Sequence, residues 1–146
     1  MKEVLSVPGG KTQAIIKEYL VHAHPHPRSY KAAQYMAIRE PGGIMNTLYS
    51  VQCEFVLRPL ERGWEKSIAI LSEDTQKRLK GYIAERAKDF GCDQKDEYKF
   101  YLLNVEKELN HLPRTSVTLP GHTYFTLGEL TSGREIVLSE LKLNEQ

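Results

Sequence analysis

The stretch Tyr-Ser-Val-Gln-Cys-Glu-Phe-Val-Leu at residues 49–57 carries the clearest periodic pattern in the chain. Apolar residues stand at every odd-numbered position from Tyr49 to Leu57, and polar residues stand between them at positions 50, 52 and 54. Alternation with a period of two predicts a β-strand with one buried face and one solvated face. We therefore expect a strand over residues 49–57, with Cys53 packed on its apolar face.

Further elements are predicted on both sides of this strand. Thr12 can cap a helix over 12–23, and Ser72 can cap a helix over 73–90 that stops at Gly91. We expect the basic residues of the second helix to form a solvated face: Lys77, Arg78, Lys80, Arg86 and Lys88. A short helix is expected over 105–112, and residues 136–143 fit either a strand or a helix. The remaining strands are expected over 3–7, 34–39, 98–103, 116–119 and 124–127.

Strands outnumber helices in this prediction and do not alternate regularly with them. This order favours an α+β fold with a curved sheet or barrel of about five to seven strands and two main helices. The length of 146 residues is that of one domain, which we expect to span residues 1–146.

The overall charge gives no indication of a partner. Twenty Lys and Arg residues stand against 19 Asp and Glu residues, for a formal net charge of +1. No apolar run approaches the length of about 20 residues that a membrane span requires, and the first residues do not follow a signal-peptide pattern. We expect a soluble cytoplasmic protein without a membrane partner, in which any nucleic-acid surface is local.

The turn after the first predicted strand is a candidate phosphate site. Pro8-Gly9-Gly10-Lys11-Thr12 is similar to the end of a phosphate-binding loop, but the full pattern requires a glycine where Leu5 stands. Two interpretations stay open, a tight strand-to-helix turn and the phosphate site of a small nucleotide-acting enzyme. In either case the amides of Gly9, Gly10 and Thr12, together with the Lys11 side chain, suit an anion.

Histidines at positions 22, 24 and 26 share one face if the chain is extended there. Three imidazoles can bind zinc, but no orienting carboxylate stands nearby, and His24 and His26 are expected in a solvated loop. We assign no metal and no cofactor. No nucleophile motif is present either, so the sequence favours a binding module over an enzyme.

Residues 22–39 contain basic and aromatic side chains without any acidic residue. Basic groups neutralise phosphates and aromatic rings stack on bases, so this mixture indicates a nucleic-acid surface. A basic loop with core tyrosines, or a patch that binds a protein partner, would give the same composition. The candidates from this segment are Arg28, Tyr30, Lys31, Tyr35 and Arg39.

Several segments taken in order resemble the PUA-like modules of the EVE and ASCH type, which occur beside restriction and defence enzymes. The segments are Val4–Pro8, Arg28–Lys31, Gln34–Ile38, Gly42–Ile44, Tyr49–Leu57, Tyr98–Leu103 and Tyr124–Leu130. The helix over 73–90 has no counterpart in this resemblance. The lysine, threonine and glutamate arrangement of the enzymatic relatives is not recognisable in the chain.

The resemblance implies a small, strongly bent β-barrel with flanking helices that binds DNA or RNA. Some modules of this type hold a modified or flipped base in a pocket beside the barrel. Under this interpretation Tyr30, Tyr35, Tyr49 and Trp64 supply stacking surfaces. Phosphate contacts come from Arg28, Lys31, Arg39 and Arg114.

Overall fold

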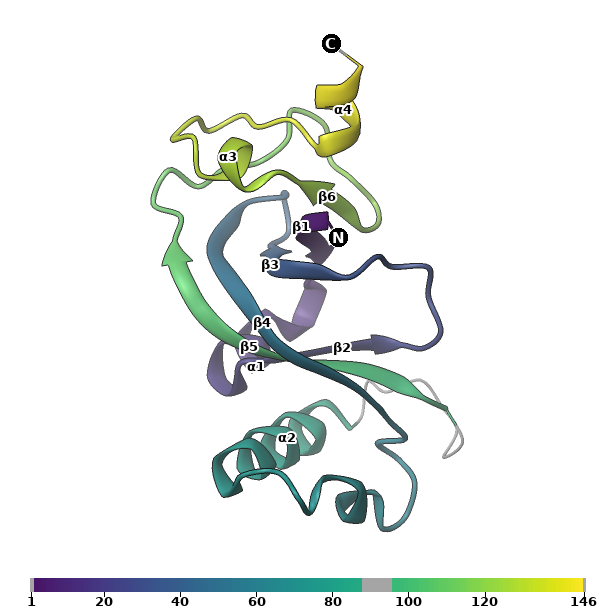
Figure 1. Cartoon of the computed structure of the whole chain (residues 1–146). Coiled ribbons are helices and arrows are strands. Elements are labelled where there is room, and N and C mark those ends of the chain that lie inside the picture. Colours follow the sequence, from purple (N-terminus) through teal and green to yellow (C-terminus); the bar gives the residue numbers. More distant parts are fainter. Residues whose placement is uncertain (1, 88–95, 146) are drawn as a thin grey trace. The chain divides into compact units, whose positions relative to one another are not determined.

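A computed structural model describes residues 2–87 and 96–145 (Figure 1). The chain forms two compact units. Unit 1 contains Met1–Gln13, Tyr30–Val51 and Asn104–Gln146, and unit 2 contains Ala14–Ser29 and Gln52–Leu103. The elements are β1 (Lys2–Pro8), η1 (Gly10–Thr12), α1 (Gln13–Tyr19), β2 (Val21–Pro25), β3 (Ala33–Arg39), β4 (Met45–Leu57), η2 (Trp64–Ile68), α2 (Glu73–Arg86), β5 (Tyr98–Glu108), β6 (Thr123–Phe125), α3 (Leu127–Leu130) and α4 (Glu140–Asn144).

Six strands join in one mixed sheet of order β2-β5-β4-β3-β1-β6. Strands β1 and β3 are parallel, whereas β1 with β6, β3 with β4 and β2 with β5 are antiparallel. The pairing of β3 with β4 shifts register between Ala37 and Arg39, and such a bulge bends the strand that contains it. The expected α+β class, with a bent mixed sheet and two main helices, is confirmed. The expectation of a single domain stays a prediction.

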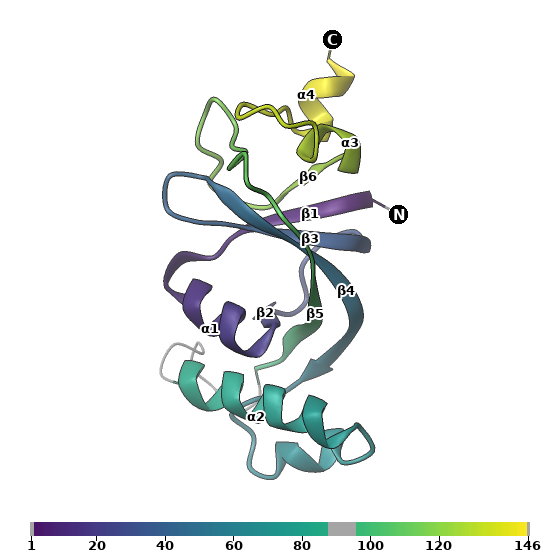
Figure 2. The same cartoon turned by 90° about the vertical axis from the view of Figure 1, so that its left-hand side faces the viewer.

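The core of unit 1 lies on one face of β1, β3 and β4. Figure 2 shows β6, α3 and α4 gathered at one end of this unit. Strand β6 adds to the edge of β1 with Phe125 opposite Val4, and the chain after it covers the sheet. The buried apolar residues of this core are Val4, Ala37, Met45, Leu48, Leu109, Phe125, Leu130 and Val137.

In unit 2, helix α2 packs through a buried stripe of Leu79, Tyr82 and Ile83. The ring of Tyr82 meets that of Phe100 edge to face, with centroids 6.2 Å apart. Arg78 donates hydrogen bonds of 2.8–2.9 Å to the carbonyls of Tyr19, Leu20 and Leu103. The expectation that Arg78 and Arg86 lie on a solvated face is wrong, because both are partly buried and satisfy backbone carbonyls.

The helix expected over 12–23 is shorter than predicted. It occupies only Gln13–Tyr19, after the 3₁₀ turn η1, and it ends at Leu20, whose φ of 54° is left-handed. The following residues form β2, which pairs with β5. The spacing of the apolar residues over 15–23 is that of a helix, so local pattern alone does not predict a strand at 21–23. The pairing of β2 with β5 decides the structure of these residues.

Three further expectations are also wrong. Residues 105–108 continue β5 instead of forming a helix, and 116–119 form no strand. Cys53 is exposed. Helix α4 resolves the ambiguity at 136–143 in favour of a helix for Glu140–Asn144. The expected helix stop at Gly91 falls outside the described residues.

Within the described ranges 2–87 and 96–145, no helix has the length and apolar character needed to cross a membrane.

Replacing Ser72 by alanine should lower the free energy of unfolding by about 1 kcal/mol, because the Ser72 hydroxyl accepts a hydrogen bond from the Thr75 amide at the first turn of α2. Urea unfolding followed by circular dichroism measures the change. The matched control is Ser67→Ala, an exposed serine in η2, which should change stability by less than about 0.5 kcal/mol. Equal losses in the two variants would contradict the capping role.

Candidate nucleic-acid interface

Parallel pairing of β1 with β3 brings two of the predicted site segments together in unit 1. Pro8 at the end of β1 lies opposite Arg39 at the end of β3. The next amide, that of Gly9, donates a hydrogen bond of 2.9 Å to the carbonyl of Arg39. The turn over 9–12 and the basic segment that ends at Arg39 therefore share one end of the sheet.

Arg39 is a buried cation with neutral partners. Its side chain is 3% exposed. Nη1 donates to the hydroxyl of Ser6 at 3.0 Å and more weakly to the Ser6 carbonyl, and Nη2 donates to the carbonyl of Gly121. Burial lowers the pKa of Arg39, because removing a cation from water without a nearby anion disfavours its charged form.

The Arg39 cavity is a small hollow of about 170 Å³ in unit 1. Three segments form its walls: the end of β1 with the following turn, the end of β3 with the following turn, and the chain before β6. Gly42 and Gly43 have φ angles of 92° and 90°, which only glycine adopts without strain, so backbone rather than side chains forms this wall. The lining residues are Pro8, Gly10, Arg39, Glu40, Pro41, Gly42, Gly43, Thr118 and Leu119.

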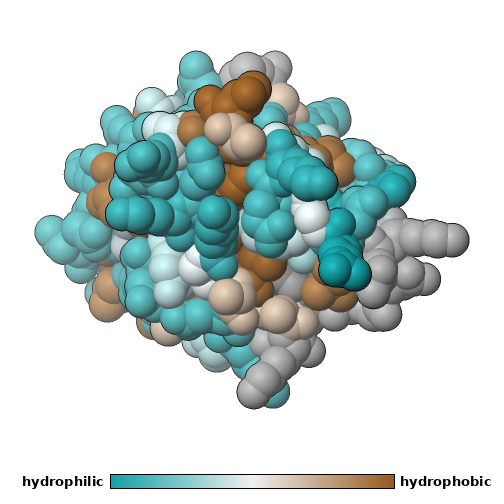
Figure 3. Space-filling model, turned by 90° about the horizontal axis from the view of Figure 1, so that it is seen from below, coloured by the Kyte–Doolittle hydropathy of each residue, from teal (hydrophilic) through white to brown (hydrophobic). Residues whose placement is uncertain are grey.

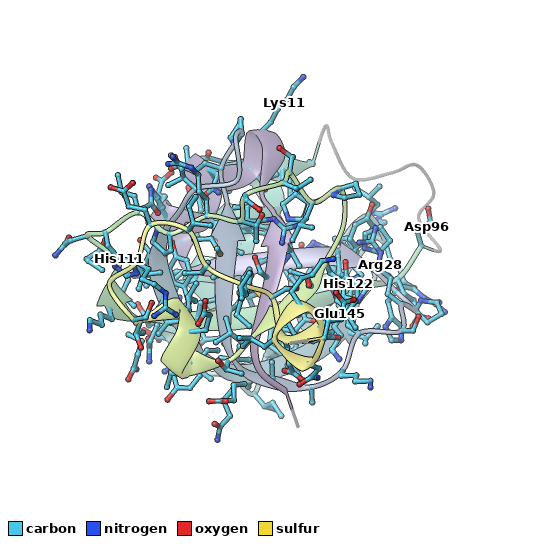
Figure 4. The ribbon with its side chains drawn as sticks, turned by 90° about the horizontal axis from the view of Figure 1, so that it is seen from above. Lys11, Arg28, Asp96, His111, His122 and Glu145 are labelled. Atoms are coloured by element: carbon cyan, nitrogen blue, oxygen red, sulfur yellow. The ribbon has the colours of Figure 1, made fainter. Side chains whose placement is uncertain are left out.

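The turn over 9–12 contributes one residue, Gly10, to this cavity. The Thr12 hydroxyl does not cap a helix as expected; it donates to the Gly9 carbonyl at 2.7 Å, and the Thr12 amide bonds the same oxygen. Figure 4 shows the exposed Lys11 side chain extending away from the ribbon. The amides of Gly9 and Thr12 are thus used within the protein, and Gly10 is the turn residue that faces the cavity.

An aromatic cluster lies next to the Arg39 cavity. The rings of Tyr30 and His122 are 4.2 Å apart, and His122 meets Tyr124 edge to face at 5.6 Å. The Tyr124 hydroxyl accepts a hydrogen bond of 2.7 Å from the amide of Lys31. Because Gly121 bonds Arg39 and precedes His122 in the chain, the Tyr30–His122–Tyr124 cluster borders the buried guanidinium.

Sequence analysis missed His122 and Tyr124 as site residues. Both stand far along the chain from the basic segment: His122 follows Pro120-Gly121 in what looks like an ordinary loop, and Tyr124 lies in the strand predicted over 124–127. Only the pairing of β6 with β1 brings them beside Tyr30. No pattern in the local sequence marks this proximity.

Tyr35 is half-buried and lines a second hollow of about 190 Å³ in unit 1, the Tyr35 pocket. Its apolar walls are Leu48 and Leu127, and Lys107 stands among its polar residues. Glu106 and Thr131 complete the lining. The pocket therefore combines one aromatic ring with a basic side chain.

The other predicted site residues do not line either hollow. Tyr49 is 2% exposed and packs in the core of unit 1. Arg114 is half-buried, and its backbone forms a bridge with Ile136. Arg28, which is exposed, and Trp64, which is half-buried, belong to unit 2.

His22 and His24 lie on β2 in unit 2 and are buried, which corrects the expectation that His24 sits in a solvated loop. The Nδ1–H of His24 donates to the carbonyl of Pro25 at 2.8 Å, so its Nε2 accepts from the Tyr101 hydroxyl, also at 2.8 Å. The His22 ring stacks on Tyr101 with centroids 6.1 Å apart. Both nitrogens of His24 are engaged within the protein and are not available to a metal.

Burial is the largest cause of low basicity in both rings. It lowers the pKa of His22 from 6.5 to about 3 and that of His24 to about 4, with nearby positive charge adding to the effect. Arg86 contributes this repulsion at His22. No cluster of three or more metal-binding side chains occurs within residues 2–87 and 96–145.

Comparisons with protein-family models and with curated proteins find no match. A crystal structure of a mutant of ZmASCH from Zymomonas mobilis is similar, with a TM-score of 0.46 and 11% sequence identity. The superposition covers 86% of this chain and 90% of that chain. ZmASCH carries in its name the ASCH type that the sequence resembles.

The buried histidines should make the protein less stable in mild acid. Their folded pKa values lie below the unfolded value, so the unfolded chain binds more protons as the pH falls from about 6.5 toward 4. Stability is then fully present above pH 6.5 and should fall by about 1–2 kcal/mol per histidine between pH 7 and pH 5. Urea unfolding of the wild type and of His22→Gln at both pH values measures it.

The His22→Gln variant should lose less stability on acidification than the wild type, because one of the two buried imidazoles is gone. The control is His122→Gln, which removes an exposed histidine and should keep the full pH dependence. A His22→Gln variant with the same acid sensitivity as the wild type would show that other groups cause it.

Proposed function

We propose that the protein binds single-stranded nucleic acid, DNA or RNA, through unit 1. The observation that carries this proposal is the juxtaposition of a buried, unneutralised Arg39 with the half-exposed Tyr30–His122–Tyr124 cluster. A phosphate supplies the negative charge that Arg39 lacks, and bases stack on aromatic rings. A positive charge for the phosphate and aromatic rings for the bases thus lie side by side.

The energetic argument begins with the cost of Arg39. An isolated buried charge destabilises a fold by several kcal/mol unless a partner neutralises it, and three neutral acceptors provide hydrogen bonds without opposite charge. Within the described residues no carboxylate forms an ion pair with Arg39. An anionic ligand would offset this cost, which is how binding sites commonly differ from cores built for stability.

The Tyr30–His122–Tyr124 cluster supplies the surface for bases. His122 is exposed and Tyr30 is half-exposed, so a flat base can reach the outer faces of these rings. Exposed Lys31 follows Tyr30 directly and adds a positive charge near the cluster. Because the net charge of the chain is only +1, we expect weak binding that depends on these local groups.

The Tyr35 pocket is the place we assign to a single flipped or modified base. Its volume of about 190 Å³ is below the 300–1,000 Å³ that is typical of sites for drug-sized ligands. A hollow of this size suits a single base rather than a whole nucleotide. A base in it would pack on the Tyr35 ring between Leu48 and Leu127, with Lys107 available to its edge.

A protein-interaction surface is the alternative. On the face that Figure 3 shows, outside the grey atoms, hydrophilic side chains separate the apolar ones. Ile70, at 95% exposure, is the most exposed large apolar residue in the described part of unit 2. Singly exposed apolar residues are normal in soluble proteins, so this surface favours no partner.

Binding of a fluorescent single-stranded oligonucleotide at several salt concentrations tests the proposal. Affinity should fall with salt, with a slope of about −0.7 for each phosphate contact, and Lys31→Ala should reduce the slope by about 0.7 if Lys31 makes one. His122→Ala should weaken binding by about 1–3 kcal/mol, because one stacking ring is lost.

Two variants serve as comparisons. Lys80→Ala removes an exposed charge of the same kind from α2 in unit 2 and should leave the slope unchanged. Arg28→Ala measures whether that side chain adds a contact of its own. If no DNA or RNA strand, with or without modified bases, shows saturable binding at low salt, the nucleic-acid function is wrong and a protein partner becomes the better hypothesis.

A further inference from the structure

Arg39 presents an unused donor at the Arg39 cavity. Its side-chain hydrogen bonds all involve Nη1 and Nη2, so within the described residues the Nε–H has no protein acceptor. A guanidinium offers its donors as a planar fork, which matches the spacing of two oxygens on one phosphorus. Nη2 carries a second hydrogen besides the one bonded to Gly121, so this hydrogen and the Nε–H can together bind two oxygens of one oxyanion.

The cavity is large enough for one phosphate group. At about 30 Å³ for each water-sized volume, a hollow of 170 Å³ holds roughly five or six such volumes. A phosphate group fits within this volume together with a few water molecules. Three chain segments wall the cavity, so a ligand meets protein on several sides.

We infer that the Arg39 cavity recognises the terminal phosphate of a nucleic-acid strand. This inference rests on the proposed function and makes it specific for strand ends. An internal phosphodiester carries a nucleoside on each side, whereas a terminal phosphomonoester carries one, which can remain outside near the Tyr30–His122–Tyr124 cluster. The terminal group also bears nearly two negative charges at neutral pH, against one for an internal phosphate.

The backbone of the walls supports this assignment. Gly9 has right-handed and Gly10 left-handed backbone angles, a succession that commonly turns neighbouring amides toward an anion. The Gly9 amide bonds the Arg39 carbonyl, so Gly10 is the residue through which this turn meets the cavity. Gly10 lines the cavity, as do Gly42 and Gly43, and no side chain stands at these positions to prevent close approach of a ligand.

Glu40 is the one carboxylate in the lining. Its Oε1 accepts a hydrogen bond of 2.7 Å from the Asn46 side chain, which holds that oxygen toward Asn46. A negative charge in the wall limits the affinity for a dianion. Removing the charge of Glu40 should therefore strengthen phosphate binding, whereas removing the charge of Arg39 should weaken it. Glutamine at position 40 can still accept the hydrogen bond from Asn46 while lacking the charge.

The experiment compares strands of one sequence with a 5′-phosphate, a 3′-phosphate or hydroxyl groups at both ends. One phosphorylated strand should bind the wild type about ten- to a hundredfold more tightly than the hydroxyl strand, in line with charge-assisted hydrogen bonds. Arg39→Gln should abolish this difference, and Glu40→Gln should enlarge it several-fold. Thermal unfolding establishes that each variant is folded, and inorganic phosphate serves as competitor.

The outcomes separate the inference from the function on which it rests. Equal binding of all three strands by the wild type overturns the terminal-phosphate site and leaves nucleic-acid binding intact, whereas absence of binding to every strand overturns both. An end preference that persists in folded Arg39→Gln also overturns the inference. If Arg39→Gln does not fold, an unchanged preference in Glu40→Gln overturns it instead. Binding of inorganic phosphate without any end preference shows an anion site that does not read strand ends, and overturns it too.

Discussion

The parallel pairing of β1 with β3 is the interaction on which the rest of unit 1 depends. It sets Pro8 opposite Arg39, so the turns that follow the two strands leave the sheet at the same end. The other edge of β1 is paired with β6, which draws the chain around Gly121 and His122 to that end as well. A shift of one residue in the β1–β3 register would move Arg39 to the opposite face of the sheet, because side chains alternate.

A buried guanidinium without an anion destabilises a fold. This chain keeps Arg39 in a sheet whose core face is lined mainly by apolar residues. Ser6 lies among Val4, Ala37 and Met45 on that face, and its hydroxyl is the side-chain acceptor that Arg39 uses. The fold tolerates the charge because Nη1 and Nη2 of Arg39 have hydrogen-bond acceptors, and the anionic ligand that we propose would neutralise it. Stability alone would favour an apolar residue at position 39.

Unit 2 uses its partly buried arginines, Arg78 and Arg86, in the opposite way. Arg78 donates to the carbonyls of Tyr19 and Leu20 where α1 ends, and the Leu20 carbonyl also accepts a hydrogen bond from the Leu103 amide. Arg86 bonds the carbonyl of Ala23 and the hydroxyl of Tyr82, and thereby links α2 to β2. These cations hold backbone groups in place. Burial of an arginine is therefore not evidence of a site by itself; the cavity beside Arg39 makes the difference.

The sequence by itself determined the strands with local patterns and the helix with a local cap. The strand over 49–57 and the Ser72 cap of α2 are both found, because each depends on residues within a few positions of one another, although burial does not alternate along that strand. The basic and aromatic composition of 22–39 likewise pointed to Arg39 and Tyr30. Tertiary structure decided the rest: pairing with β5 converted residues 21–23 from a helix into β2, and pairing with β6 brought His122 to Tyr30. Contacts between distant segments leave no local periodicity, so a single sequence does not reveal them.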